Sequence, residues 1–254
     1  MNKIKSPFKD INQFKIEIFS FLKLHKATIA NQANKISQYF EMSAYNSIVK
    51  YYETNGYKVT IKNLIDNKFR YKLSPTGYPF NFSYFEVSKI YYYKKNIKKY
   101  FFEIHHNLAI ESSNNNKIFL TPDICVINKN SLEELKDPRY FFSGSRHYYY
   151  VKNENLQTFC EVKNYNPFPE LLFSFIGMLQ ELMKEVFLNR ISNSRPRHIA
   201  PSLLISGSGS YHTRLIQKDI MKRFKTNIFF RLFYYKSQIY SNVNMSNIQK
   251  IGTR

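Results

Sequence analysis

The sequence predicts an α/β fold in which helices flank a mixed central β-sheet. Stretches with apolar residues at helical spacing alternate with short, strongly apolar runs typical of strands. The elements follow the order helix, strands, helix, strand, helix, strand, which is typical of a sheet covered by helices. A hydrophobic fraction of 43% in 254 residues supplies a core for one large domain.

Helices open the chain. Apolar residues recur near helical spacing through residues 10–26 and again through 31–54, where Asn55-Gly56 marks the end because Gly usually follows a helix. A short alternating strand is expected at 57–61. Residues 64–98 are rich in Lys and Tyr, and we expect them to form a basic insert with one or two hairpins.

The second half supplies most of the expected sheet. We expect strands at 100–110, 118–127, within 148–163, at 199–205 and at 227–235, with helices at 167–189 and 214–224. The chain then divides into a helical extension over 1–30, a main domain over 31–235 that carries the insert at about 64–98, and a loose polar tail over 236–254.

The charge balance indicates a polyanionic partner. Lys and Arg number 38 against 18 Asp and Glu, a formal net charge of +20, and nucleic acid is the commonest partner of such a surplus. An AT-rich genome explains part of the Lys count but not the scarcity of carboxylates. No apolar run approaches the roughly 18 residues of a membrane helix, and the polar N-terminus lacks a secretory pattern, so we expect a cytoplasmic protein without a membrane partner.

Three residues carry the candidate chemistry. Asp123 precedes the apolar run Ile124–Ile127, and Glu161 and Lys163 stand two apart at the end of another apolar strand. Side chains alternate along a strand, so Glu161 and Lys163 share one face. Burying these charges is costly unless something compensates, and a divalent cation held by Asp123 and Glu161 would do so. A surface ion pair with Asp123 as a turn residue is the alternative.

Pro122-Asp123 followed by Glu161-Val162-Lys163 resembles the PD-(D/E)XK nuclease superfamily, and the resemblance covers roughly residues 31–235 less the insert. It implies a restriction-endonuclease-like fold and a metal-dependent endonuclease that hydrolyses DNA phosphodiester bonds. Asp123, Glu161 and the Val162 backbone carbonyl would bind Mg²⁺ or Mn²⁺, and Lys163 would orient the attacking water. Many members add a Glu from the leading helix, for which Glu41 is the better match and Glu53 the weaker one.

The motif is specific only in context. Asp66-Asn67-Lys68 and Glu134-Leu135-Lys136 also fit the carboxylate-x-Lys pattern, but neither ends an apolar strand. Cys125 and Cys160 lie in apolar runs and are expected to be reduced core residues, and the two cysteines and six histidines offer no zinc spacing.

Several residues are secondary candidates. His105, His106 and Gln180 are possible supports of the site, although hydrogen-bonded strand-end histidines and a solvent-facing Gln explain them equally simply. The loop Ser206-Gly207-Ser208-Gly209 is either a phosphate cradle or a plain strand-to-helix turn. Candidate nucleic-acid contacts come from the basic segments and are Lys94, Lys95, Lys98, Lys99, Arg146, Arg195 and Arg197.

Alternative functions stay open at this stage. The chain is expected to cut DNA, in a setting such as restriction or anti-phage defence, but it is also compatible with a DNA-binding subunit on a nuclease-like fold. An effector activated by a partner protein and an RNA-directed nuclease are further alternatives. A double-strand cutter with one site per chain would favour a twofold homodimer.

Overall fold

A seven-stranded mixed sheet forms the centre of the molecule. The structure is a computed structural model that describes residues 11–30, 33, 35–93, 96–135, 148–188, 190–232 and 248–254. Among these, the strand order across the sheet is β14-β13-β11-β8-β5-β4-β2. The strands are β2 (Lys58–Lys62), β4 (Tyr84–Tyr93), β5 (Asn96–His106), β8 (Ile124–Asn128), β11 (Leu156–Lys163), β13 (Ser202–Ile205) and β14 (Asn227–Phe229).

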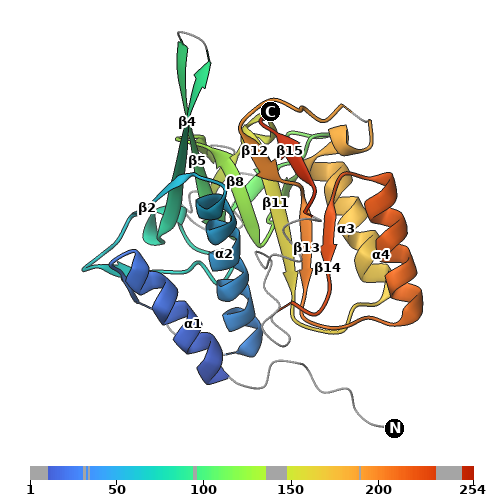
Figure 1. The fold of residues 1–254 in the computed structure, drawn as a ribbon, viewed down its shortest axis with the longest axis horizontal. Helices are drawn as coiled ribbons and strands as arrows, with labels where there is room; N and C mark the ends of the chain where they lie inside the picture. Colours follow the sequence, from blue (N-terminus) through green and yellow to red (C-terminus); the bar gives the residue numbers. More distant parts are fainter. Residues whose placement is uncertain are drawn as a thin grey trace.

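The direction of the strands changes at β11. β11, β13 and β14 are parallel, while β8, β5, β4 and β2 follow on the other side of β11 in antiparallel succession. Parallel neighbours need a crossover, which α3 (Pro169–Leu182) supplies between β11 and β13 and α4 (Tyr211–Arg223) supplies between β13 and β14. Both helices lie side by side at the right of Figure 1.

Each face of the sheet has its own core. α1 (Ile11–Leu24) and α2 (Ile36–Thr54) pack with Ile124, Val126 and Cys160 on one face, and α3 packs with Cys125 and Phe159 on the other. This division follows from the alternation of side chains along β8 and β11. Both cysteines are buried and free, as the sequence predicts.

Smaller elements surround the main sheet. A four-stranded sheet has the order β7-β6-β10-β9, and β12 pairs with β15, as β1 does with β3. Their bounds are β1 (Thr28–Ile29), β3 (Lys68–Phe69), β6 (Ala109–Glu111), β7 (Phe119–Leu120), β9 (Leu132–Leu135), β10 (Tyr148–Val151), β12 (Arg197–Ile199) and β15 (Lys250–Gly252). Short 3₁₀ helices span Pro79–Asn81, Asn153–Asn155 and Lys184–Val186.

The predicted α/β class, with a large mixed sheet between helices, is confirmed. The predicted insert at 64–98 is wrong in one respect, because β4 lies between β5 and β2 within the main sheet. Phe85 and Val87 stand two positions apart on β4, and both are fully buried in the core that includes α2. This segment is therefore a strand of the main sheet. β4 and β5 do form the expected hairpin, which projects beyond the other strands at the top of Figure 1.

The expectation of a loose C-terminal tail is also wrong for residues 248–254. β15 pairs with β12, and Ile251 is 1% exposed. The Arg254 guanidinium donates to Asn153 and pairs with Glu185. In the portion of the chain described above, no helix combines the length and apolar character that crossing a membrane requires.

Candidate active site

Strand pairing brings Asp123 and Glu161 together. β8 and β11 are antiparallel, with Ile124 opposite Cys160. Asp123 comes directly before β8 and Glu161 directly after Cys160, so the next position of the register places the two carboxylates side by side. Two residues 38 apart in the sequence therefore meet at one edge of the sheet.

Hydrogen bonds fix this pair. The Asp123 amide donates to Glu161 Oε1 at 3.2 Å, and the Val162 amide donates to Asp123 Oδ2 at 2.7 Å. The amide and carbonyl of one strand residue point to the same side, so the Val162 carbonyl points toward Asp123 as well. This orientation makes the carbonyl a third oxygen beside the two carboxylates.

Lys163 joins both carboxylates. Its Nζ lies 3.1 Å from Asp123 Oδ2 and 2.8 Å from Glu161 Oε2. Glu161 and Lys163 share a strand face, as the sequence predicts, and only 7% of the Glu161 side chain is exposed against 28% for Lys163. The ammonium therefore sits at the mouth of a buried acidic pair.

Glu41 approaches the same cluster from α2. Burial and then the charge of Asp123 raise the pKa of Glu41 to about 7, while Lys163 opposes the rise. Glu53 forms an ion pair with Lys50 at 2.6 Å and lies twelve residues further along α2, roughly 18 Å away at the rise of an α-helix. Of the two carboxylates predicted from the helix, Glu41 lies within electrostatic reach of the cluster, whereas Glu53 is paired with Lys50 away from it.

The cluster carries more negative than positive charge. Burial and then the neighbouring Asp123 raise the pKa of Glu161 to about 7, against the effect of Lys163. Burial alone would lower the pKa of Lys163, but Glu161 and Asp123 outweigh it and hold that pKa above its ordinary value. With all groups ionised, Glu41, Asp123, Glu161 and Lys163 would sum to −2, which a divalent cation would balance.

Asn107 and Lys72 hold the backbone of Asp123, and neither residue was predicted from the sequence. The backbone amide of Asn107 donates to the backbone carbonyl of Asp123 at 2.9 Å. Lys72 is 5% exposed, and its Nζ donates to the carbonyls of Asn107, Ser74 and Pro75. Burial lowers the pKa of Lys72 to about 8. The one sequence feature that could have indicated a buried role for Lys72 is its position between the apolar residues Tyr71 and Leu73.

The loop at 206–209 supports the segment that follows Lys163. The amides of Ser206, Gly207 and Ser208 donate to Lys163 O, Tyr165 O and Asn166 Oδ1. Because these amides are used internally, the loop is a strand-to-helix turn rather than a phosphate cradle. A Cβ on Gly207 would lie 2.5 Å from Asn166 Cα, so only glycine allows this contact.

The two histidines lie on opposite faces of β5. His105 pairs with Glu103 at 3.0 Å and stacks on Tyr84 with ring centroids 4.4 Å apart. His106 is buried against Tyr45, and burial followed by the Lys72 charge lowers its pKa to about 3. Among the described atoms neither ring nitrogen of His106 has a hydrogen-bond partner. Among the described residues, neither histidine forms a hydrogen bond with the cluster, so the structure does not bring either one to it.

Gln180 is not brought to the cluster. Its side chain is exposed near the end of α3, and its backbone carbonyl accepts from Ser113 and Asn114. The phase of α3 turns the Gln180 side chain outward, as in the solvent-facing alternative.

The predicted nucleic-acid contacts come from different elements of the fold. Lys98 and Lys99 are exposed on β5 in the projecting hairpin. Arg195 and Arg197 are exposed at and before β12. Lys94, Lys95 and Arg146 lie outside the described residues.

The donor types at the cluster fit a hard divalent cation. Asp123, Glu161 and Glu41 offer carboxylate oxygens and Val162 a carbonyl, which suit Mg²⁺ or Mn²⁺. The carboxylates of the cluster are not close enough together to hold a metal ion as they stand. Within the described ranges, no three His, Cys, Asp or Glu groups are arranged to do so. The Lys163 ammonium lies between Asp123 and Glu161 instead, so binding a metal there would require Lys163 to withdraw.

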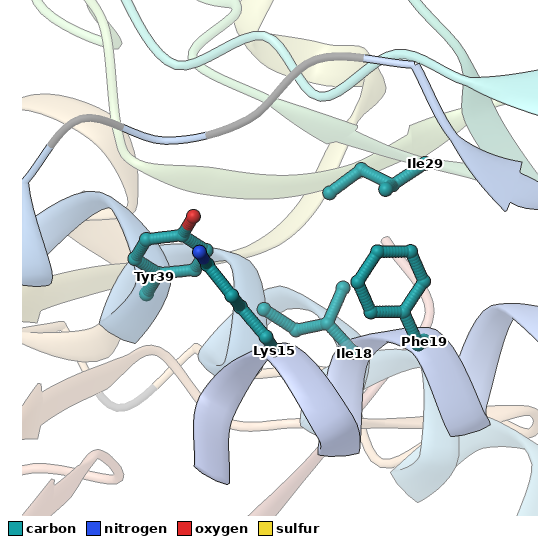
Figure 2. Close-up of a pocket in the computed structure, with 5 residues that line it drawn as sticks. All are labelled: Lys15, Ile18, Phe19, Ile29 and Tyr39. Carbon is teal, nitrogen blue, oxygen red and sulfur yellow. The ribbon is translucent and has the colours of Figure 1, made fainter. Parts of the chain in front are cut away.

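A hollow between α1 and α2 offers no competing site. Figure 2 shows Lys15, Ile18 and Phe19 facing Ile29 and Tyr39 around it. Its volume of about 10 Å³ leaves room for about one water molecule. The hollow is too small for a substrate.

Comparisons with known proteins leave the site to be judged on its geometry. A scan of protein-family models and searches of curated proteins and of solved structures each found no match to this chain.

Proposed function

We propose that the chain is a metal-dependent endonuclease that hydrolyses phosphodiester bonds in DNA on a restriction-endonuclease-like fold. The observation that carries this proposal is the meeting of Asp123 with Glu161 and Lys163 at one sheet edge, joined by hydrogen bonds and ion pairs. Glu41 on α2 adds a third carboxylate within electrostatic reach.

The arrangement of elements supports the fold assignment. α2 packs on β11, and β5, β8 and β11 are antiparallel neighbours. α3 then leads to β13, parallel to β11. This is the order of helix, strand meander, helix and strand that the resemblance implies.

Each residue has a distinct proposed task. Asp123, Glu161 and the Val162 carbonyl would hold the cation, with Glu41 as a further oxygen donor. A bound divalent cation supplies charge neutralisation at the phosphate and lowers the pKa of a bound water. Lys163 Nζ has three donor hydrogens and would direct one at the attacking water, while its positive charge stabilises the phosphate oxygens.

The net charge of +20 supports a polyanionic substrate. Exposed Lys98 and Lys99 on the projecting β4–β5 hairpin are suited to contact a phosphate backbone. These contacts would position the strand without reading its sequence.

Plasmid cleavage tests the proposal. Supercoiled DNA is incubated with the protein and Mg²⁺ or Mn²⁺, and Asp123→Asn and Lys163→Met are compared with Glu53→Gln, a carboxylate variant on α2 away from the cluster. We expect wild type and Glu53→Gln to cut, both cluster variants to lose activity by a factor on the order of 10² or more, and EDTA to stop the reaction.

Two results would overturn the proposal. One is wild-type protein that binds DNA and cuts neither DNA nor RNA with any divalent cation, which would indicate a binding module. The other is cleavage that persists in Asp123→Asn and Lys163→Met. Cleavage of RNA alone would overturn the assignment of DNA as the substrate.

A further inference from the structure

A second polar site lies at the opposite end of α2 from Glu41. A cavity of about 420 Å³ opens beside Asn55, which follows the last residue of α2. Its charged lining consists of Lys89, Arg195, Arg197 and Lys250, and the described lining includes no carboxylate. The tyrosines Tyr57 and Tyr91 complete its walls. The volume lies within the range of small-molecule sites.

Strand pairing builds this cation cluster. In the β12–β15 ladder Arg197 is opposite Gly252 and Ile199 is opposite Lys250, so Arg197 and Lys250 project from the same face. Lys89 and Tyr91 come from β4 and line the same cavity as Arg197 and Lys250. The Tyr57 hydroxyl donates to the Arg197 carbonyl at 3.0 Å and ties β12 to the start of β2.

The lysines are held without being neutralised. Lys89 Nζ donates to the Asn55 carbonyl at 2.5 Å and lies 5.0 Å from the Tyr57 ring centroid and 5.3 Å from that of Tyr91. Lys250 Nζ donates to Asn55 Oδ1 at 3.0 Å. An ammonium has three donors, so each lysine keeps donors for a ligand.

Stabilising the C-terminal end of α2 explains only half of the cluster. Cations favour that end of a helix, which accounts for Lys89 and Lys250 on Asn55. Arg195 and Arg197 are exposed, and in the ranges the structure describes neither forms an ion pair. Burial, followed by the charges of Arg197 and Lys89, lowers the pKa of Lys250. Four like charges around one cavity indicate that an anion belongs there.

We propose that this cavity binds the phosphate group of a nucleotide, with Arg195, Arg197, Lys89 and Lys250 as its donors and Tyr91 as an aromatic wall for the base. Guanidinium groups match phosphate oxygens in pairs, and a half-buried tyrosine offers a stacking surface. The nucleotide is either free or part of a nucleic-acid strand, since both present the same phosphate and base.

The site is separate from the candidate active site. Asn55 follows Glu41 by 14 residues, which is roughly 21 Å along an α-helix. A phosphate bound at Arg197 is therefore not the phosphate attacked near Asp123, and the inference does not rest on the proposed nuclease function.

Calorimetric titration tests the inference. AMP and a short single-stranded oligonucleotide are titrated in EDTA into wild type, R195Q/R197Q and K218Q/K222Q. Lys218 and Lys222 are exposed on α4, so the second double variant is a control that loses the same charge elsewhere. Lys89→Met tests a third donor, and unfolding midpoints confirm that each variant is folded.

We expect wild type to bind and R195Q/R197Q to bind at least about tenfold more weakly, because charge-assisted hydrogen bonds are lost. Lys89→Met should weaken binding as well. K218Q/K222Q should match the affinity of wild type within about twofold. Binding of AMP identifies a free nucleotide, and binding of the oligonucleotide alone identifies a strand. The inference is overturned if wild type binds neither ligand, or if the two double variants lose affinity equally.

Discussion

Replacing Glu161 by Gln removes the most buried carboxylate of the cluster without changing its shape. Burial and the neighbouring Asp123 raise the pKa of Glu161 from 4.5 to about 7 in the folded protein. The folded state therefore keeps a proton between these two pH values that the unfolded state has released. Stability depends on the difference in bound protons, so this carboxyl contributes stability that is present below pH 4.5 and is lost as pH rises through about 7.

The size of the effect follows from the pKa values. A difference of about 2.5 pKa units corresponds to roughly 3 kcal/mol. Gln does not titrate, so the free energy of unfolding of Glu161→Gln should gain roughly 2–3 kcal/mol on wild type between pH 5 and pH 8. Urea unfolding at pH 5, 6, 7 and 8 in EDTA measures this directly.

Glu53→Gln provides the control, because Glu53 is paired with Lys50 away from the cluster. Its stability difference from wild type should stay constant across the same pH range. Mg²⁺ should also stabilise wild type more than Glu161→Gln at pH 8, because the variant loses a ligand. Unfolding curves for wild type and Glu161→Gln that run parallel from pH 5 to pH 8 would refute the account of a charge-strained carboxyl.

Three further variants test other parts of the site. Glu41→Gln should slow DNA cleavage by a factor on the order of 10 to 100, whereas Glu53→Gln stays within about twofold; equal rates for the two variants would remove Glu41 from the site. Gly207→Ala should cost roughly 1–3 kcal/mol in urea unfolding, because its Cβ would meet Asn166 Cα at 2.5 Å. Its control, Gly177→Ala, meets nothing within 4 Å on α3 and should stabilise by about 0.5–1 kcal/mol; equal stability changes for both would contradict the close contact at Gly207. Lys72→Met should destabilise by roughly 1–3 kcal/mol at pH 7, because the carbonyls of Ser74, Pro75 and Asn107 lose their donor. Unchanged unfolding of Lys72→Met would show that these bonds do not hold the loop.

The central strands and the core of the site were predictable because local signals agree there. β8 and β11 are short apolar runs, and the positions of Asp123 and Glu161 at their ends follow once the strands pair antiparallel. Glu41 was predicted from the helix and the resemblance, and the structure places it within electrostatic reach of Asp123.

The wrong predictions concern segments whose local composition does not indicate their place in the folded structure. β4 buries Phe85 and Val87 in its first half, whereas Lys89, Tyr91 and Tyr92 in its second half are only half-buried or exposed, so this Lys- and Tyr-rich half concealed a sheet strand. β15 is three residues long and gains its stability by pairing with β12, which no local pattern reveals. The cavity near Asn55 draws its cations from β4, β12 and β15, and sequence spacing cannot show a convergence made by tertiary packing.

Calorimetric titration of Mn²⁺ tests most directly the central claim that Asp123 and Glu161 form a divalent-cation site. Wild type and Glu53→Gln should bind Mn²⁺ with the same affinity, and Asp123→Asn should lose that binding by at least about tenfold because a charged ligand is gone. Equal Mn²⁺ affinity in wild type and Asp123→Asn would contradict the claim.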